Sequence, residues 1–229
     1  MSTVAATPPH ESLVRTARLT GLFYLGLAIT GMFGFLLVRP ALFVQGDPSA
    51  TLARLVDHEG MARAGIALEM GIVVTQSLAA LWFFRLFRSV DDFGAAAIAA
   101  FGFVNAIAVL ASAAFLATAL QVALAPLGAA AADAQLMYLV SGNFWQVGNL
   151  FFGLWLMPMG WCVLRSRWMP WLLGWILVVG GAGYVLSAFV SVLAPGSGLA
   201  SGLLVMPATV GEFWMIGHLL ARGINRVAS

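Results

Sequence analysis

Two glutamates stand inside otherwise apolar stretches of this sequence, and they are its strongest candidates for chemistry. Glu69 lies in the stretch 64–84, and Glu212 lies in the stretch 199–221. An acidic residue at the centre of a membrane helix costs about 2.5–3.5 kcal/mol on insertion scales. Each glutamate therefore requires a proton, a polar partner or a bound ligand.

Amide side chains repeat at helical spacing in two of the same stretches. Gln146 and Asn149 fall on one face of a helix, and Gln76 shares a face with Glu69. Small residues beside them allow a neighbouring backbone to approach closely. We predict that Glu69, Gln146, Asn149 and Glu212 line one site inside a helix bundle, for a small ligand or a proton. Interhelical hydrogen bonding is the alternative for the amides, and structural pairing is the alternative for the glutamates.

Composition predicts the elements that must hold these residues. Of 229 residues, 62% are hydrophobic and 9% are charged, whereas soluble domains average about 25% charged residues. We therefore predict an all-α polytopic bundle in a lipid bilayer, with a cytoplasmic tail at 1–14 and one membrane domain at 15–226. A spanning helix needs about 20 apolar residues. Six stretches meet that length: 19–38, 64–84, 94–124, 137–164, 171–193 and 199–221.

The loops follow from the breakers and the charges. Arg39-Pro40 is expected to end the first helix and to begin a polar outer loop at 39–63, with a short interfacial helix within 49–59. Pro126 and Gly128 predict an alanine-rich loop at 125–136.

Arginine counts predict the orientation, because basic residues favour the cytoplasmic side. Eight arginines flank the helices on the side of the N-terminus: Arg15, Arg18, Arg85, Arg88, Arg165, Arg167, Arg222 and Arg226. Three belong to the opposite side: Arg39, Arg54 and Arg63. Both termini are therefore predicted to be cytoplasmic.

The outer loop offers a second kind of site. Asp47, His58 and Arg63 are candidates for contact with a membrane-protein partner, although Glu59 and Arg63 stand four residues apart and can pair on a helix. No metal site is predicted, because no second histidine stands at ligand spacing from His58.

The remaining reactive residues have structural interpretations. Pro207 predicts a kink in the last helix, and His218 is expected at the inner interface with an edge in water. Cys162 is the only cysteine, so it excludes an intramolecular disulfide and is expected to be a buried thiol. No cofactor is predicted, since no two histidines share a depth at which they could ligate haem.

Function remains open between three classes. The first is a protein that binds or transports a small ligand or proton, and the second is a non-catalytic structural or regulatory protein that acts through a partner. The third, an intramembrane lipid-modifying enzyme, lacks any recognisable catalytic motif, and it would require Ser141 or Ser187 near one of the two glutamates. The small net charge of +2 and the absence of a basic run argue against nucleic acid.

Short segments spread over residues 15–225 resemble a family of bacterial membrane proteins known as domain of unknown function 4386 (DUF4386). The segments are Arg18-x-x-Gly21-x-x-Tyr24-Leu25, Arg63-x-Gly65-Ile66, Phe151-Phe152-Gly153-Leu154, Arg165-Ser166-x-x-x-Pro170-x-x-Leu173-Gly174, Gly181-x-Gly183-Tyr184 and Pro207-Ala208-x-x-Gly211-Glu212. The resemblance implies a small polytopic bacterial membrane protein, and so a place in a bacterial inner membrane, and it assigns no activity.

Overall fold

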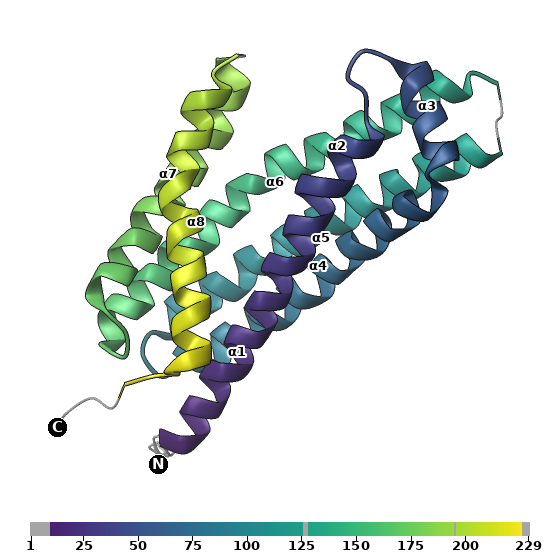
Figure 1. Ribbon diagram of the computed structural model, residues 1–229. Coiled ribbons are helices and arrows are strands. Elements are labelled where there is room, and N and C mark those ends of the chain that lie inside the picture. The colour runs from purple at the N-terminus through teal and green to yellow at the C-terminus, as the bar shows by residue number, and fades with distance from the viewer. Residues whose placement is uncertain (1–9, 126–127, 195, 226–229) are drawn as a thin grey trace. The chain divides into compact units, whose positions relative to one another are not determined.

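The computed structural model describes residues 10–125, 128–194 and 196–225, and the regular elements in those ranges are all helices (Figure 1). The long ones are α1 (His10–Gly31), α4 (Glu59–Phe87), α5 (Asp92–Leu124), α6 (Ala130–Ser166), α7 (Trp171–Leu193) and α8 (Gly198–Ala221). Short elements follow α1: the π-helix η1 (Met32–Val38), α2 (Arg39–Leu42) and α3 (Pro48–Asp57).

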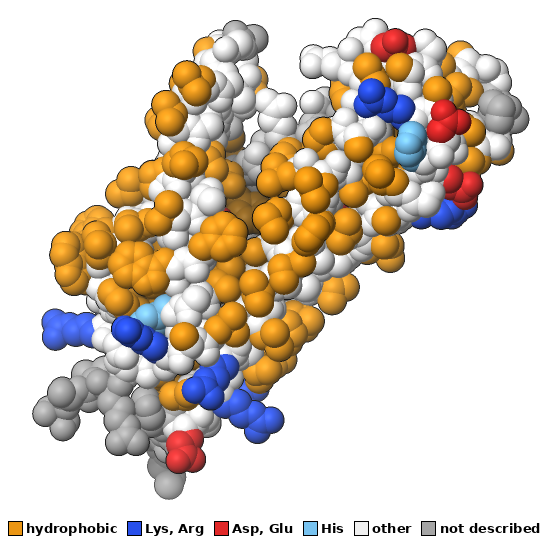
Figure 2. Space-filling view, viewed as in Figure 1, with side chains coloured by type: hydrophobic (Ala, Val, Ile, Leu, Met, Phe, Trp, Pro, Cys, Tyr) orange, Lys and Arg blue, Asp and Glu red, His pale blue; other side chains and the backbone are white. Residues whose placement is uncertain are grey.

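The predicted fold class is confirmed. In the described part of the chain, six helical spans are long and apolar enough to cross a membrane, and each overlaps one of the six predicted stretches. Large hydrophobic side chains such as Leu36, Val74, Ile107 and Leu203 remain mostly exposed. Figure 2 shows hydrophobic side chains over the flanks of the helices and charged side chains near helix ends. Such flanks suit a hydrocarbon solvent.

Several predicted boundaries are wrong. Helix α1 begins at His10, so residues 10–14 of the expected tail are helical, and residues 1–9 lie outside the described ranges. Helix α6 begins at Ala130 rather than 137, because its alanines favour helix and Asp133 suits a first turn. The breaker Pro126 lies outside the described residues, as does Arg226.

The first helix also continues past its predicted end. Residues 32–38 widen into a π-helix and lead directly into α2, so that Arg39 and Pro40 are helical rather than part of a loop. Pro40 occupies the first turn of α2, where a missing N–H is tolerated. The short helix expected within 49–59 is present as α3.

The chain divides into two compact units. The first unit comprises residues up to 25, 78–103 and those from 150 onward, and the second comprises 26–77 and 104–149. The core of the second unit joins α2, α3, α4, α5 and α6 through a cluster that includes Leu42, Leu55, Leu116 and Tyr138.

Glycines bring the helices of the first unit close together. On α6, a Cβ at Gly153 would lie 2.6 Å from the Gly181 carbonyl oxygen of α7, and one at Gly160 would lie 2.5 Å from the Gly174 oxygen. The two pairs step in opposite directions along the chain, which makes α6 and α7 antiparallel. Helices α7 and α8 also run side by side (Figure 1), with Gly180 against the backbone of Ala208. Backbone proximity of this kind is how membrane helices associate.

Asp91 fastens the junction of α4 and α5 to the end of α6. Its carboxylate accepts hydrogen bonds from the Gly94 N–H (3.0 Å), Arg165 (2.7 Å) and the Trp161 indole (3.1 Å). The Gly94 N–H bond first, and then the Arg165 bond, hold the pKa of Asp91 below its ordinary value.

We expect Asp91→Asn to destabilise the protein at neutral pH but not at strongly acidic pH. A lowered carboxyl pKa stabilises the fold fully above the unfolded-state value of about 3.9, and that contribution is lost as the pH falls through the folded-state pKa. Thermal unfolding of both proteins across this range measures the difference. A gap between the two melting temperatures that is the same at every pH would contradict the assignment.

Candidate functional site: a buried ion pair beside an amide-lined cleft

Arg39 reaches the interior of the second unit because the chain does not leave the membrane helix at that point. π-Helical turns precede Arg39, α2 continues directly from them, and Arg39 is only 8% exposed. π-helical turns are frequent at functional sites. The prediction that Arg39 lies in the outer loop is therefore wrong.

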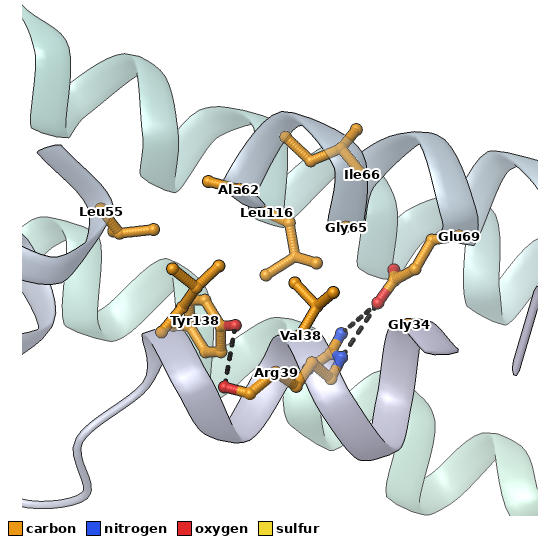
Figure 3. Close-up of a pocket in the computed structure, with 11 residues that line it drawn as sticks. Gly34, Val38, Arg39, Leu55, Ala62, Gly65, Ile66, Glu69, Leu116 and Tyr138 are labelled. Carbon is orange, nitrogen blue, oxygen red and sulfur yellow. Dashed lines mark hydrogen bonds and ion pairs between the residues drawn. The ribbon is translucent and has the colours of Figure 1, made fainter. Parts of the chain in front are cut away.

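Glu69 of α4 is the main partner of Arg39. The guanidinium donates from Nε (2.9 Å) and Nη2 (2.7 Å) to Oε1 of Glu69, as Figure 3 shows. Glu69 is 1% exposed, so this is a buried ion pair. Charges in such a place are tolerated when they are paired and fully hydrogen-bonded.

Further donors complete the hydrogen bonding of Glu69. Ser112 of α5 donates to Oε2 at 2.8 Å, and the Trp145 indole of α6 donates to Oε1 at 3.1 Å. Nη2 of Arg39 also lies 2.6 Å from both Ser112 Oγ and Ser141 Oγ. Because Nη2 has two hydrogens and three acceptors, one of these bonds is shared.

One face of α6 encloses the guanidinium of Arg39. The carbon at its centre lies 5.7 Å from the ring centroid of Tyr138 and 5.8 Å from that of Trp145, two cation–π contacts. These two residues are seven apart, with Ser141 between them on the same helical face. The arrangement holds one positive and one negative charge together in a neutral cluster.

A cleft of about 580 Å³ opens beside this cluster, within the second unit. Its lining includes Arg39 and the α6 residues Tyr138, Trp145, Gln146 and Asn149. Three further polar or small residues and five apolar ones complete the wall: Gln45, Gly142, Asn143, Pro40, Phe35, Leu36, Phe43 and Leu139. The volume is in the range of small-molecule sites.

Three of the predicted site residues thus belong to the second unit. Glu69 is the anion of the buried pair, and Gln146 and Asn149 line the neighbouring cleft. Glu212 belongs to the first unit, where Oε1 accepts a 2.6 Å hydrogen bond from the Tyr24 hydroxyl of α1. The single site shared by all four stays a prediction.

The outer-loop candidates are used locally. Asp47 caps α3 by accepting from the Ala50 N–H at 2.9 Å, a contact that lowers the pKa of Asp47. Arg63 pairs with Glu59 at 2.6 Å, which confirms the expected i, i+4 pair. His58 ends α3, with Nδ1 3.3 Å from the Arg54 carbonyl oxygen. A role for these residues in partner contact stays a prediction.

For the other residues interpreted from the sequence, the structure agrees with some expectations and not with others. Cys162 is buried as expected, but His218 is only 6% exposed, so its predicted wet edge is wrong. Pro207 lies within α8, which continues on both sides of it. Ser141 contacts Ser112 rather than a glutamate directly, and Ser187 donates to the Tyr184 carbonyl oxygen. In the described ranges, no group of three or more His, Cys, Asp or Glu side chains is placed to hold a metal ion.

Six helical spans, each long and apolar enough to cross a membrane, define a multi-pass helical membrane protein, and its second unit contains the buried ion pair. The chain belongs to the family described as Domain of unknown function (DUF4386), whose model matches residues 19–223 and so includes all of Tyr24, Arg39, Glu69 and Glu212. The predicted family is confirmed. Neither a curated protein nor a solved structure matches the chain.

Proposed function

We propose that the cleft of the second unit binds a membrane lipid with an uncharged or zwitterionic head group. The observation that carries this proposal is a row of three amides on α6, Asn143, Gln146 and Asn149, which line the cleft. Their side chains have no hydrogen-bond partner in the described part of the chain, although they belong to a span long enough to cross a membrane.

Unpaired amides are costly in a bilayer. An amide transferred from water to an apolar medium without a compensating hydrogen bond loses about 4–8 kcal/mol. The three residues are spaced by three, so they share one side of α6 and can address one ligand together. A bound head group with hydroxyl, amide or phosphate groups would supply the missing partners.

The rest of the wall supports the chemical class. Phe35, Leu36 and Leu139 are 42%, 60% and 46% exposed, so apolar side chains of the spanning helices border the cleft where an acyl chain would lie. Arg39 is the one charged residue among those that line the cleft, and Glu69 neutralises it. A head group without net charge therefore fits better than an anion.

Native mass spectrometry of the whole protein tests this proposal with two probes, phosphatidylethanolamine and phosphatidylglycerol. We expect preferential retention of phosphatidylethanolamine, whose head is zwitterionic. Replacing both Gln146 and Asn149 with leucine should weaken that retention about tenfold, since each lost hydrogen bond is worth about 0.5–1.5 kcal/mol.

Gln121→Leu is the matched control, because Gln121 is an exposed amide on α5 outside the cleft lining. It should retain the lipid as the wild type does. The proposal would be refuted if the double variant retained phosphatidylethanolamine as well as the wild type does. A preference of the wild type for phosphatidylglycerol would also refute it.

We also infer that the protein lies in a bacterial inner membrane with both termini in the cytoplasm. Since Arg39 is buried in the ion pair, the outer side keeps only two of its three arginines, Arg54 and Arg63, and the charge bias grows. Alkaline phosphatase fused after Gly128 should be active and the same enzyme fused after Ser89 inactive. The opposite pattern would reverse the orientation.

A further inference from the structure

The first unit holds a carboxyl group whose surroundings differ in kind from those of Glu69. Glu212 of α8 receives one short hydrogen bond, 2.6 Å from the Tyr24 hydroxyl to Oε1. Tyr24 is itself 1% exposed, which keeps water from this side of the bond. The cleft proposed to bind lipid does not include Glu212, so its role is a separate question.

No positive charge of the described residues compensates Glu212. Among the described residues it forms no ion pair, whereas Glu69 has Arg39 and two further hydrogen-bond donors, Ser112 and Trp145. Two titratable groups interact with Glu212: the hydroxyl of Tyr24 on α1 and that of Tyr184 on α7. Both are phenols, which are neutral near pH 7.

Uncharged rings surround these two phenols. Phe83 of α4 and Trp155 of α6 pack edge-on against Tyr24, with ring centroids 5.4 Å and 5.5 Å away. Phe152 of α6 stacks on Tyr184 at 5.9 Å. Glu212 itself is partly exposed, but it lies in a span that is long and apolar enough to cross a membrane. An ionised carboxylate there would have hydrocarbon and uncharged rings beside it instead of a counter-charge, a situation that proteins avoid by neutralising the group.

Unused hydrogen-bonding capacity lies in the same cluster. The indole Nε1 of Trp155, a residue that is fully buried, interacts with the Tyr24 hydroxyl without forming a hydrogen bond of ordinary geometry to any described residue. The Tyr184 hydroxyl likewise has no hydrogen-bond partner in the described ranges. Spare polar groups beside a lone carboxyl group allow its hydrogen bonds to rearrange when its charge changes.

We propose that Glu212 is a reversible proton-binding residue. In the protonated state its Oε2 carries the proton and Oε1 still accepts from Tyr24. In the ionised state the proton has left to solvent, and the Tyr24 hydrogen bond becomes charge-assisted and stronger. Proton uptake by Glu212 is thus a function of the first unit, independent of lipid binding in the second.

Infrared difference spectroscopy of the whole protein reads this proton directly. The wild-type spectrum minus that of Glu212→Gln should contain the carbonyl band of a carboxylic acid at neutral pH, replaced by carboxylate bands at alkaline pH. Glu59→Gln is the matched control, because Glu59 is an exposed glutamate paired with Arg63. Its difference spectrum should contain carboxylate bands at neutral pH.

Tyr24→Phe distinguishes a proton site from a merely structural hydrogen bond. Loss of the hydroxyl removes a bond that favours the carboxylate, so the acid band should persist to higher pH than in the wild type. Carboxylate bands alone at every pH, or an unchanged titration in Tyr24→Phe, would overturn the proposal.

A labelling experiment on the unmodified chain keeps the test valid if a variant does not fold. Dicyclohexylcarbodiimide takes the proton of a carboxylic acid onto nitrogen, and the carboxyl oxygen then bonds to the carbodiimide carbon, so that the reagent is added whole. We expect the adduct on Glu212, decreasing as the pH rises, and none on the ion-paired Glu69. An adduct on Glu69 in preference to Glu212, or none on Glu212 at acidic pH, would overturn the proposal.

Discussion

Replacing Arg39 with methionine is expected to destabilise the protein by about 3–5 kcal/mol, the largest loss that we predict for a single change. The guanidinium is the only cation paired with Glu69 among the described residues, and both side chains are buried. Removing it leaves an uncompensated charge in the interior, and that charge accounts for most of the expected cost.

Removing both partners of the ion pair should cost much less stability than removing one of them. Changing Arg39 to methionine and Glu69 to leucine together removes both charges and restores apolar packing, an exchange that is often neutral or stabilising. The double variant should therefore be more stable than Arg39→Met alone, and the strong coupling between the sites should appear in a double-mutant cycle.

Unfolding in sodium dodecyl sulfate, followed by circular dichroism, measures these free energies on one scale. Arg63→Met is the matched control, because the N–O distance of the Arg63–Glu59 pair, 2.6 Å, is close to the 2.7 Å of the buried pair, whereas 63% of the Arg63 side chain is exposed. Exposed pairs contribute about 0–1 kcal/mol. If Arg39→Met and Arg63→Met had equal effects, the charge of Glu69 would not depend on Arg39.

Of the two residues in the buried ion pair, Glu69 stands out in the sequence, whereas Arg39 does not. Length and apolar character predicted six spans, since a bilayer imposes both on every helix that crosses it. A glutamate inside a span was visible as an anomaly for the same reason. The sequence does not predict the burial of Arg39, because an arginine that follows an apolar stretch usually marks the membrane surface, and no sequence pattern indicates that the helix continues through π-helical turns into α2.

Tyr24 was missed for a different reason. A tyrosine in a membrane helix is unremarkable by composition, so nothing in the sequence pairs it with Glu212, which stands 188 positions further along the chain. Only packing between helices assigns such partners. The amides were predicted as lining residues from their spacing alone, and the cleft includes both Gln146 and Asn149.

Helix ends depend on local competition that a hydropathy pattern does not resolve. Alanines at 130–132 lie between a loop and a hydrophobic stretch and have little hydropathy signal of their own. Their strong helix propensity extends α6 by more than a turn beyond the predicted start at 137.

Gly160→Val is expected to destabilise the first unit by about 3 kcal/mol, the upper end of what overpacking usually costs. A Cβ at this position would lie 2.5 Å from the Gly174 carbonyl oxygen and 2.9 Å from the Val178 nitrogen, both backbone atoms of α7. Backbone atoms cannot change rotamer to make room, so α6 and α7 must separate. Close backbone approach is a main source of helix association in lipid, where the hydrophobic effect gives no help.

Gly142→Val on the same helix is the control for the change in helix propensity. No atom lies within 4 Å of a Cβ built at Gly142, and valine favours helix over glycine by a few tenths of a kcal/mol. Its free energy of unfolding in sodium dodecyl sulfate should match or slightly exceed the wild-type value. The free energy of unfolding of Gly160→Val should therefore be lower than that of Gly142→Val. If it were not, α6 and α7 would tolerate a wider separation, and the paired glycines would not set the contact between them.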